Sequence, residues 1–490
     1  MAEVAAAAIA AEQVVATGVE TAAAIAVAAP TLPLKICLTH LPNPAPEGSA
    51  HPALARSHHT LTVIRNKAYI FGGMDASGTL CPPGIHTITL PAAPTIVTDP
   101  ASASSLSGHT GGGNGKEQEK KKKKKGKERE EEGEENGGDK PGAGAAYTCY
   151  PPYTLQDAQT GETLVPQPRG AHAACALRGR YLLVHGGRGT DGAPVEEGNC
   201  IWQWDCDALT WAKLRGTSQL GVDLAPGRWG HWLFADDEQG FLVMVGGKTK
   251  DGGGGGESEM EVWMYDLHAA AWTILPRVPA RPLAAAYAEG KIYVISGGEG
   301  EEATGDAKLG GTVHFMDMRK SPTEREKPDA LVWQGIQFPA NPLTPGPQPR
   351  TGGALVPLKT GHGRTYLVYM FGSSDEEDGK GKREYYSDIW TLQLPARAHS
   401  AAALKDKIRE KLPRFESGEF RWAEAEIIPA EQIAAGGKVH PGPRGYFAAD
   451  ACLNGHGVML WGGINAKGEV EGDGWVLRLA HGYADNERYE

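Results

Sequence analysis

A short module returns six times along this chain of 490 residues, and it constrains the fold more than any other feature of the sequence. Each copy begins near an arginine, continues through a short strand and reaches an apolar run that ends at glycine. The apolar runs cover residues 68–71, 181–185, 241–245, 292–296, 366–371 and 458–461. Paired glycines follow five of them, and Gly372-Ser373 follows the remaining one. Such runs, with β-branched and aromatic members, are typical of strands buried on both faces.

Each pair of strands is followed by two more predicted strands. The third strands are predicted over residues 85–90, 200–204, 262–266, 313–317, 388–394 and 475–479. An aromatic residue marks a fourth strand in five modules: Trp211, Trp272, Trp333 and Trp422, with Tyr147 or Tyr150 in the first module. A ring of this size buries about 150 to 250 Å² of surface, so we expect it to hold neighbouring modules together.

Paired glycines after the second strand, followed at a distance by an aromatic residue and a tryptophan, resemble the kelch repeats of the galactose oxidase superfamily. The resemblance covers residues 32–480 and implies an all-β fold, a single six-bladed kelch-type β-propeller. The last module supplies three strands and stops after Leu479. We expect residues 34–38 to provide its missing strand, because this closure removes a free sheet edge and ties the two ends of the chain together.

Four segments are predicted to lie outside the repeated pattern. Residues 1–31 are rich in alanine, and residues 481–490 form a short polar tail. Residues 91–146 combine a Pro/Ser/Gly stretch with a lysine run and a glutamate-rich run, which cannot bury a core, so we expect a disordered low-complexity insertion in the first blade. Residues 400–412 are predicted to form a short helical insertion with Ser400 as its N-cap.

Composition narrows the classes of function. The net charge of −11 argues against non-specific binding to nucleic acid or to an anionic membrane. The seven cysteines are scattered and form no Cys-x-x-Cys pair, which favours a reducing compartment over a disulfide framework or a zinc site. The acidic, alanine-rich start is a poor secretory signal, and no apolar run reaches the roughly 20 residues of a membrane span. We expect a cytoplasmic location; the lysine run at 120–125 leaves a nuclear one open.

An arginine opens each module, and these arginines are the first candidate binding residues: Arg56, Arg169, Arg228, Arg281, Arg350 and Arg444. In a propeller the first strand lines the central channel, so equivalent positions form a ring at one mouth of it. Six guanidiniums there would attract an anion. The kelch resemblance also implies ligand-binding arginines at the start of this strand. The alternative is that the repeated arginines satisfy carboxylates and carbonyls between blades.

Three modules carry a histidine three residues after the arginine, at His59, His172 and His231. The other modules have Ala284, Gly353 and Phe447 at the same position. Alanine, glycine and phenylalanine side chains cannot ligate a metal, so the pattern favours a packing position. The sequence assigns no catalytic residue, no metal ligand and no cofactor.

Three kinds of function remain open. The first is a non-catalytic module that binds an acidic peptide or protein partner at the channel mouth, with Trp229 and Tyr446 adding flat contact surface to the arginines. The second is a metal-dependent small-molecule enzyme, similar to the iron-dependent specifier proteins, whose iron is held by Glu-x-x-x-Asp-x-x-x-His. That pattern begins three times here but reaches Gly310, Leu392 and Leu477 where histidine is needed. The third is a purely structural scaffold.

Overall fold

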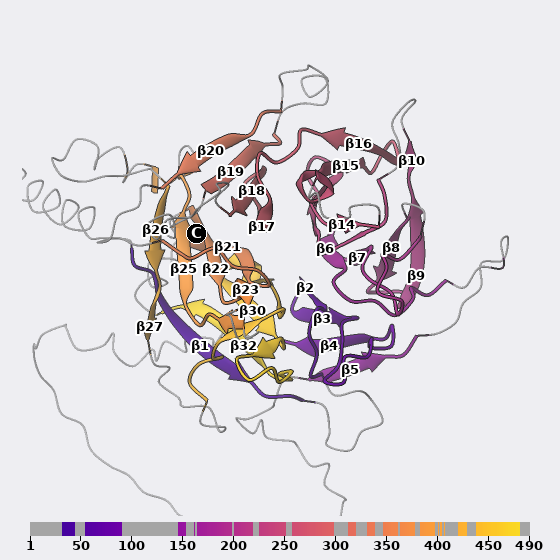
Figure 1. Ribbon diagram of the computed structural model, residues 1–490, viewed down its shortest axis with the longest axis horizontal. Helices are drawn as coiled ribbons and strands as arrows, with labels where there is room; N and C mark the ends of the chain where they lie inside the picture. The colour runs from indigo at the N-terminus through magenta and orange to yellow at the C-terminus, as the bar shows by residue number, and fades with distance from the viewer. Residues whose placement is uncertain are drawn as a thin grey trace, which may run out of the picture. The chain divides into compact units, whose positions relative to one another are not determined.

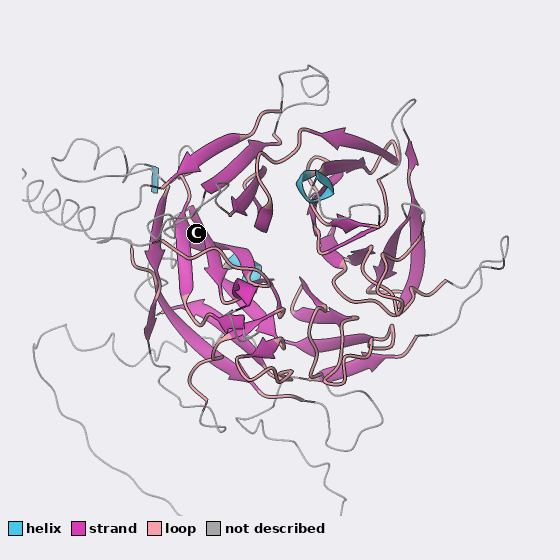
Figure 2. Ribbon diagram, viewed as in Figure 1, coloured by secondary structure: helices cyan, strands magenta, loops and turns pink. Residues whose placement is uncertain are grey.

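The protein is all-β in the computed structural model, and strands make up nearly all of its regular structure (Figure 2). The chain divides into two units, Met1–Leu90 with Ala145–Glu490, and Pro91–Gly144. All described residues belong to the first unit: 32–44, 54–90, 146–152, 161, 164–197, 200–218, 225–250, 257–297, 312–319, 331–338, 346–360, 363–377, 383–396, 400, 402–403, 406, 420–428 and 438–480. Among these residues no helix is both long and apolar enough to cross a membrane.

Six sheets form the six blades, arranged in a ring (Figure 1). Blade one contains β2 (Thr60–Ile64), β3 (Lys67–Phe71), β4 (Ile85–Thr89) and β5 (Tyr147–Tyr150). Blade two contains β6 (Ala173–Leu177), β7 (Tyr181–His185), β8 (Cys200–Asp205) and β9 (Thr210–Arg215). Blade three contains β12 (Trp232–Asp236), β13 (Phe241–Val245), β15 (Val262–Asp266) and β16 (Ala271–Leu275), with β10 (Thr217–Ser218) added in parallel to β16.

The second half of the ring follows the same order. Blade four contains β17 (Pro282–Ala288), β18 (Lys291–Ser296), β19 (Thr312–Asp317) and β20 (Gln334–Gln337). Blade five contains β21 (Ala354–Thr360), β22 (Arg364–Met370), β25 (Ile389–Gln393) and β26 (Arg421–Glu424). Blade six contains β29 (Ala448–Cys452), β30 (Gly457–Trp461), β32 (Gly474–Leu479), β1 (Lys35–Leu41) and the parallel strand β27 (Glu426–Ile428).

Short elements decorate the blades. Three two-stranded pairs are β11 (Arg228–Trp229) with β14 (Lys248–Thr249), β23 (Ser373–Glu377) with β24 (Arg383–Tyr385), and β28 (Arg444–Gly445) with β31 (Ile464–Asn465). The 3₁₀ turns are η2 (Glu257–Met260) and η3 (Leu453–Gly455). The first of these pairs joins the start of blade three to the segment that follows its paired glycines.

The ring is closed. The innermost strands β2, β6, β12, β17, β21 and β29 contact one another in succession, and β29 contacts β2. In blade six the N-terminal strand β1 pairs antiparallel with β32, from Ile36 opposite Leu479 to Leu41 opposite Gly474. Figure 1 shows this junction as indigo β1 beside yellow β32. The predicted closure is therefore confirmed, and β1 extends beyond the expected segment, to Leu41.

The core lies between the blades. It divides into six clusters, and each cluster joins residues of two neighbouring blades, including the pair formed by blades six and one. All five residues of β13 are buried, as expected for a strand covered on both faces. Trp272 on β16 packs with Leu183 and Ile201 of blade two and is fully buried. A fourth-strand tryptophan thus joins adjacent blades.

The fourth-strand aromatics lie where they were predicted in four blades, and Trp333 is the exception. Trp211, Trp272 and Trp422 lie on β9, β16 and β26, and β5 begins and ends with the two tyrosines. Trp333 directly precedes β20, and its Nε1–H donates to the carbonyl of Pro276 in the loop after blade three, at 2.8 Å. Its ring still links two blades, but through a hydrogen bond from outside the strand.

The paired glycines allow one blade to contact the backbone of the next. Gly186 has φ of 62°, and a Cβ there would lie 2.3 Å from the carbonyl oxygen of Arg228. The N–H of Gly187 donates to that same carbonyl at 2.8 Å. Only glycine permits this approach and this backbone conformation together. The repeated glycine pair is therefore a requirement of the blade-to-blade contact.

The two predicted insertions fall mainly on residues that the structure does not describe. Of the insertion at 91–146 only Ala146 is described. In the segment at 400–412, residues 402, 403 and 406 are helical, and Ser400 Oγ accepts a hydrogen bond from the N–H of Ala403 at 3.1 Å. This bond is the one expected of an N-cap.

Candidate functional site

Five of the six module-opening arginines are buried, with side chains at most 1% exposed: Arg56, Arg169, Arg228, Arg350 and Arg444. Each donates from Nη1 to the backbone carbonyl of the residue that directly follows its own second strand. The acceptors are Gly72 at 3.0 Å, Gly186 at 3.0 Å, Gly246 at 2.8 Å, Phe371 at 3.3 Å and Gly462 at 3.1 Å. A guanidinium in this position presents no surface to a partner.

Four of these buried arginines pair with a carboxylate of their own blade. The pairs are Arg169–Glu197 at 2.5 Å, Arg228–Glu261 at 2.9 Å, Arg350–Asp388 at 2.5 Å and Arg444–Asp473 at 3.2 Å. Each carboxylate lies one to three residues before the third strand, at a point that meets the arginine across the blade. The arrangement favours the structural alternative for these arginines, in place of the expected ring of binding cations.

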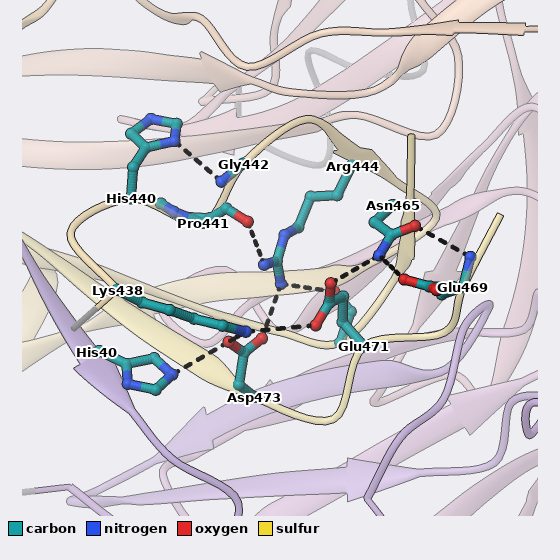
Figure 3. A network of polar contacts seen from close by, with 11 residues as sticks. His40, Lys438, His440, Pro441, Gly442, Arg444, Asn465, Glu469, Glu471 and Asp473 are labelled. Carbon is teal, nitrogen blue, oxygen red and sulfur yellow. Dashed lines mark hydrogen bonds and ion pairs between the residues drawn. The ribbon is translucent and has the colours of Figure 1, made fainter. Parts of the chain in front are cut away.

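Blade six shows the most connected of these pairs (Figure 3). Asp473 accepts from Arg444, from Lys438 at 3.0 Å and from the ring nitrogen of His40 on β1 at 3.1 Å. Burial acts to raise the pKa of Asp473, but the charges of Arg444 and Lys438 outweigh it and hold that pKa below its ordinary value. The same balance lowers the pKa of Asp388 beside Arg350. Both carboxyls therefore stay ionised near neutral pH.

Arg281 of blade four departs from the pattern. Its side chain is 47% exposed, and it pairs with Glu259 of blade three at 2.8 Å. In the other five blades three residues separate the arginine from the start of the first strand, whereas β17 begins directly after Arg281, at Pro282. Blade four therefore lacks the turn that carries each of the other arginines inward. The predicted sixfold equivalence is wrong at this blade.

The turn after the arginine links blades through the backbone. In blades one, two, three, five and six the second residue after the arginine has positive φ: His58, Ala171, Gly230, Gly352 and Tyr446. Tyr446 N–H donates to Gly352 O, His58 N–H to Tyr446 O, Ala171 N–H to His58 O, and Gly230 N–H to Ala171 O. These hydrogen bonds of 2.7–2.9 Å form a belt across four blade junctions.

The histidines three residues after the arginines occupy packing positions. His172 Cε1 and His231 Cε1 lie 2.7 Å and 2.8 Å from the positions that a Cβ on Gly72 and on Gly186 of the preceding blade would take. Burial lowers the pKa of His172 to about 3 and lowers that of His59 and His231 well below the ordinary value. These imidazoles are neutral, and they lie at three successive blade junctions. Among the described residues no group of three or more His, Cys, Asp or Glu is arranged to hold a metal ion.

Half-buried cations and aromatic rings gather at the same end of the inner strands. The guanidinium of Arg188 lies 4.7 Å from the ring centroid of Trp229, and the ammonium of Lys248 lies 5.3 Å from it. Arg188 and Lys248 each directly follow a glycine pair, so they occupy equivalent positions of blades two and three. Lys248 also lies 3.8 Å from Glu259, whereas Arg188 has no carboxylate within ion-pair distance among the described residues.

A second stack lies at the belt between blades six and one. The rings of His58 and Tyr446 are stacked, with centroids 4.5 Å apart and planes inclined by 19°. The guanidinium of Arg383 donates to the hydroxyl of Tyr446 and lies 5.9 Å from its ring. Burial, followed by the charges of Arg188 and Arg383, lowers the pKa of His58 to about 4. The positive charges of both arginines therefore help to keep the imidazole of His58 neutral. We call Arg188, Trp229, Lys248, His58, Arg383 and Tyr446 the rim cluster.

Two members of the rim cluster, Trp229 and Tyr446, were predicted as flat contact residues, and the structure brings each into contact with a cation. Sequence reasoning missed the cations. Arg188 and Lys248 had a usable signal, because each directly follows a repeated glycine pair. Arg383 had none, since it lies on a short extra hairpin, β23–β24, beyond the repeat.

The carboxylates of the incomplete iron pattern have other partners or lie outside the described residues. Asp388 and Asp473 are the partners of Arg350 and Arg444, and Glu469 contacts Asn465 at 3.0 Å. Glu302 and Asp306 lie outside the described residues. Asp388, Asp473 and Glu469 thus act in ion pairs and turns of the blades, and Glu384 is exposed on β24.

Comparisons with known proteins give limited likenesses. No protein-family model matches this chain. A curated relative, acyl-CoA-binding domain-containing protein 5 of Arabidopsis thaliana, is 30% identical over 151 residues, which are 30% of this chain and 19% of that protein. The match therefore spans about a fifth of the relative's length. The solved structure titled "Structure of YjhT" aligns with a TM-score of 0.45 and 12% identity over 90% of this chain and 98% of that chain.

Proposed function

We propose that this protein is a non-catalytic interaction module with kelch-type repeats, and that it binds an acidic peptide or an acidic segment of a protein partner at the rim cluster. Arg188, Lys248 and Arg383, and not the buried arginines, would supply the positive charge that binds the acidic segment. Trp229, Tyr446 and His58 would supply flat contact surface. Arginine, tryptophan and tyrosine are the side chains that contribute most often to the binding energy of protein interfaces.

The observation that carries the proposal is the position of Arg188. Its guanidinium lies 4.7 Å from the ring centroid of Trp229, the residue is half-buried, and it has no carboxylate partner among the described residues. The adjacent aromatic ring holds the guanidinium in place, which reduces the conformational entropy lost when a ligand binds. An arginine held in this way pairs well with a carboxylate, because its fork of donors matches the two oxygens.

The charge of the neighbourhood supports the same ligand class. Arg383 and Arg188 both lower the pKa of His58, so their fields overlap at the stacked pair of His58 and Tyr446. Lys248 and Arg281 both pair with the carboxylate of Glu259, at 3.8 Å and 2.8 Å. The cations Arg188, Lys248 and Arg383 attract acidic segments and disfavour basic ones, in a chain whose net charge is −11.

The experiment is a binding titration by fluorescence anisotropy, with two labelled libraries of twelve-residue peptides, one rich in Asp and Glu and one rich in Lys and Arg. We expect the acidic library to bind wild type, and Arg188→Glu to weaken binding at least tenfold, about 1.4 kcal/mol. Arg178→Glu is the matched control, because it makes the same charge change at an exposed turn after β6. Equal weakening by both variants, or equal binding of both libraries, would contradict the proposal and leave the structural scaffold.

A further inference from the structure

A cavity of about 630 Å³ lies at the other end of the inner strands from the rim cluster. Its walls include the turn between β12 and β13, the turn between β17 and β18, and residues that follow β19 and β25. Trp229 of the rim cluster precedes β12, whereas the cavity residue Asp236 ends it. The cavity is thus a separate site, and nothing about it depends on the function proposed above.

Carboxylates outnumber cations in the lining of this cavity. Two basic side chains contribute to it, Lys291 and Arg319. Four acidic side chains contribute to it: Asp236, Asp237, Glu238 and Glu289. Among the described residues no cation lies within ion-pair distance of the three acidic residues at 236–238. Their negative charge is therefore available to a ligand.

The two cations of the lining are engaged on β19. Arg319 donates to the two carboxylate oxygens of Asp317, at 3.0 Å and 2.5 Å. The ammonium of Lys291 lies 5.0 Å from the ring centroid of Phe315. Neither cation pairs with the acidic turn between β12 and β13, which keeps that wall of the cavity negative.

Hydrogen bonds from the neighbouring blades orient two of the carboxylates. Both oxygens of Asp237 accept from the backbone N–H of Arg178, in the turn after β6 of blade two, at 3.0 Å. Asp236 accepts from the hydroxyl of Tyr287 on β17 of blade four, at 2.5 Å. These donors are neutral, so they fix the carboxylates without cancelling their charge. A group held in place in this way loses little conformational entropy when it binds a ligand.

The arrangement of the lining favours an extended cation over a metal ion. Among the described residues no three His, Cys, Asp or Glu side chains converge closely enough to hold a metal. The volume of the cavity is within the range of small-molecule sites, roughly 300–1,000 Å³. Ala235, Pro395 and Ala396 add small apolar surface to the same lining. Such a lining suits a ligand in which charged groups alternate with methylene groups.

We propose that this cavity binds a linear polyamine, whose ammonium groups pair with the carboxylates of Asp236, Asp237 and Glu238. Short methylene chains separate the charges of a polyamine, so one molecule reaches several separate carboxylates at once. The concave shape of the cavity favours a small ligand of this kind over a segment of a protein.

The test is isothermal titration calorimetry of the full chain at constant ionic strength, with spermidine as the polyamine and butylamine as the monoamine. We expect saturable binding of spermidine, and an affinity for butylamine lower by at least about tenfold, because a single ammonium forms one ion pair. Glu238→Gln removes an exposed carboxylate and should weaken spermidine binding by roughly two- to fivefold. The double variant with Asp237→Asn should weaken it by about tenfold.

Glu424→Gln is the matched control, because it removes the same charge from an exposed residue of β26. This variant should bind spermidine as wild type does, and so should Arg188→Ala, which alters only the rim cluster. The absence of saturable binding would overturn the proposal, as would equal weakening by Glu238→Gln and Glu424→Gln, which indicates general attraction to an acidic chain. A basic peptide that binds where spermidine does not, with Glu238→Gln weakening it, would make the cavity a protein-docking site and would overturn the proposal too.

Discussion

Asp473, directly before β32, lies 3.1 Å from the ring nitrogen of His40 on β1. The carboxylate that pairs with Arg444 inside blade six therefore also contacts the strand that closes the ring (Figure 3). Lys438 reaches the same carboxylate at 3.0 Å. The side chain of Asp473 thus connects the buried Arg444 to the N-terminal strand β1.

Replacing Asp473 by Asn should destabilise the fold strongly. The change leaves the buried Arg444 without its counter-ion, which costs about 3–5 kcal/mol in comparable buried pairs. Urea unfolding followed by tryptophan fluorescence measures the loss. Glu471→Gln is the control, because Glu471 pairs with the half-exposed Lys438 at 3.7 Å and accepts from Asn465 at 2.9 Å, and its loss should change stability by less than about 1 kcal/mol. Similar losses in both variants would contradict the assigned role of Asp473.

Truncating two arginines of blade two should change the stability of the fold by very different amounts. Arg169→Ala removes a buried side chain that makes hydrogen bonds to Gln167, Gly186 and Glu197, and it should cost about 3–5 kcal/mol of stability. Arg188→Ala removes a half-buried cation of the rim cluster and should stay within about 1 kcal/mol of wild type. Calorimetry of the two variants compares them directly. If Arg188→Ala failed to fold, the rim cluster would be needed for stability, which contradicts the prediction.

Adding a methyl group at Gly186 should be far more damaging than adding one at Gly192. Both have positive φ, of 62° and 76°. A Cβ at Gly186 would lie 2.3 Å from Arg228 O, whereas at Gly192 it meets nothing within 4 Å. We expect Gly192→Ala to cost about 1 kcal/mol from backbone strain, and Gly186→Ala to cost several times more. Equal midpoints in thermal unfolding would show that blades two and three do not require the close contact.

Acid should destabilise the protein from pH 6.5 downward. Burial, followed by the charge of neighbouring arginines, lowers the pKa of His172 and His185 to about 3, against an ordinary value of 6.5. Protons then bind the unfolded chain in preference, so the stability these groups contribute is present above pH 6.5 and is lost as the pH falls toward about 3. Asp450, whose pKa burial raises to about 6, acts in the opposite direction.

The measurement is the free energy of unfolding by urea at pH 7.5 and at pH 5. His172→Gln keeps a polar group that can reach Thr60, the partner of His172 at 2.8 Å, and removes one titrating imidazole. We expect this variant to lose less stability between the two pH values than wild type does. An unchanged slope would indicate that His172 does not titrate with unfolding.

The arginine ring shows where sequence reasoning reached its limit. Arg350 and Arg281 carry the same chemistry in the sequence, yet one is buried against Asp388 and the other lies on the surface against Glu259. The difference follows from the length of chain between the arginine and the first strand, which places the side chain inside or outside the turn. Whether a buried guanidinium meets a carboxylate of its own blade depends on a residue 28 to 38 positions later in the chain, such as Glu197 or Asp388, and sequence spacing does not reveal that contact.

Local patterns along the chain were sufficient to predict the blades. Apolar runs before glycine pairs determine which strands are buried on both faces, because strand alternation and the backbone freedom of glycine are local properties. Leu38 and Leu477 pair at the closure for the same reason, since the last module lacked one strand and the N-terminal segment offered one. Only the tertiary structure decided the candidate site. Arg188, Trp229 and His58 come from three blades, and their grouping arises from the curvature of the ring, which brings the ends of separate strands together.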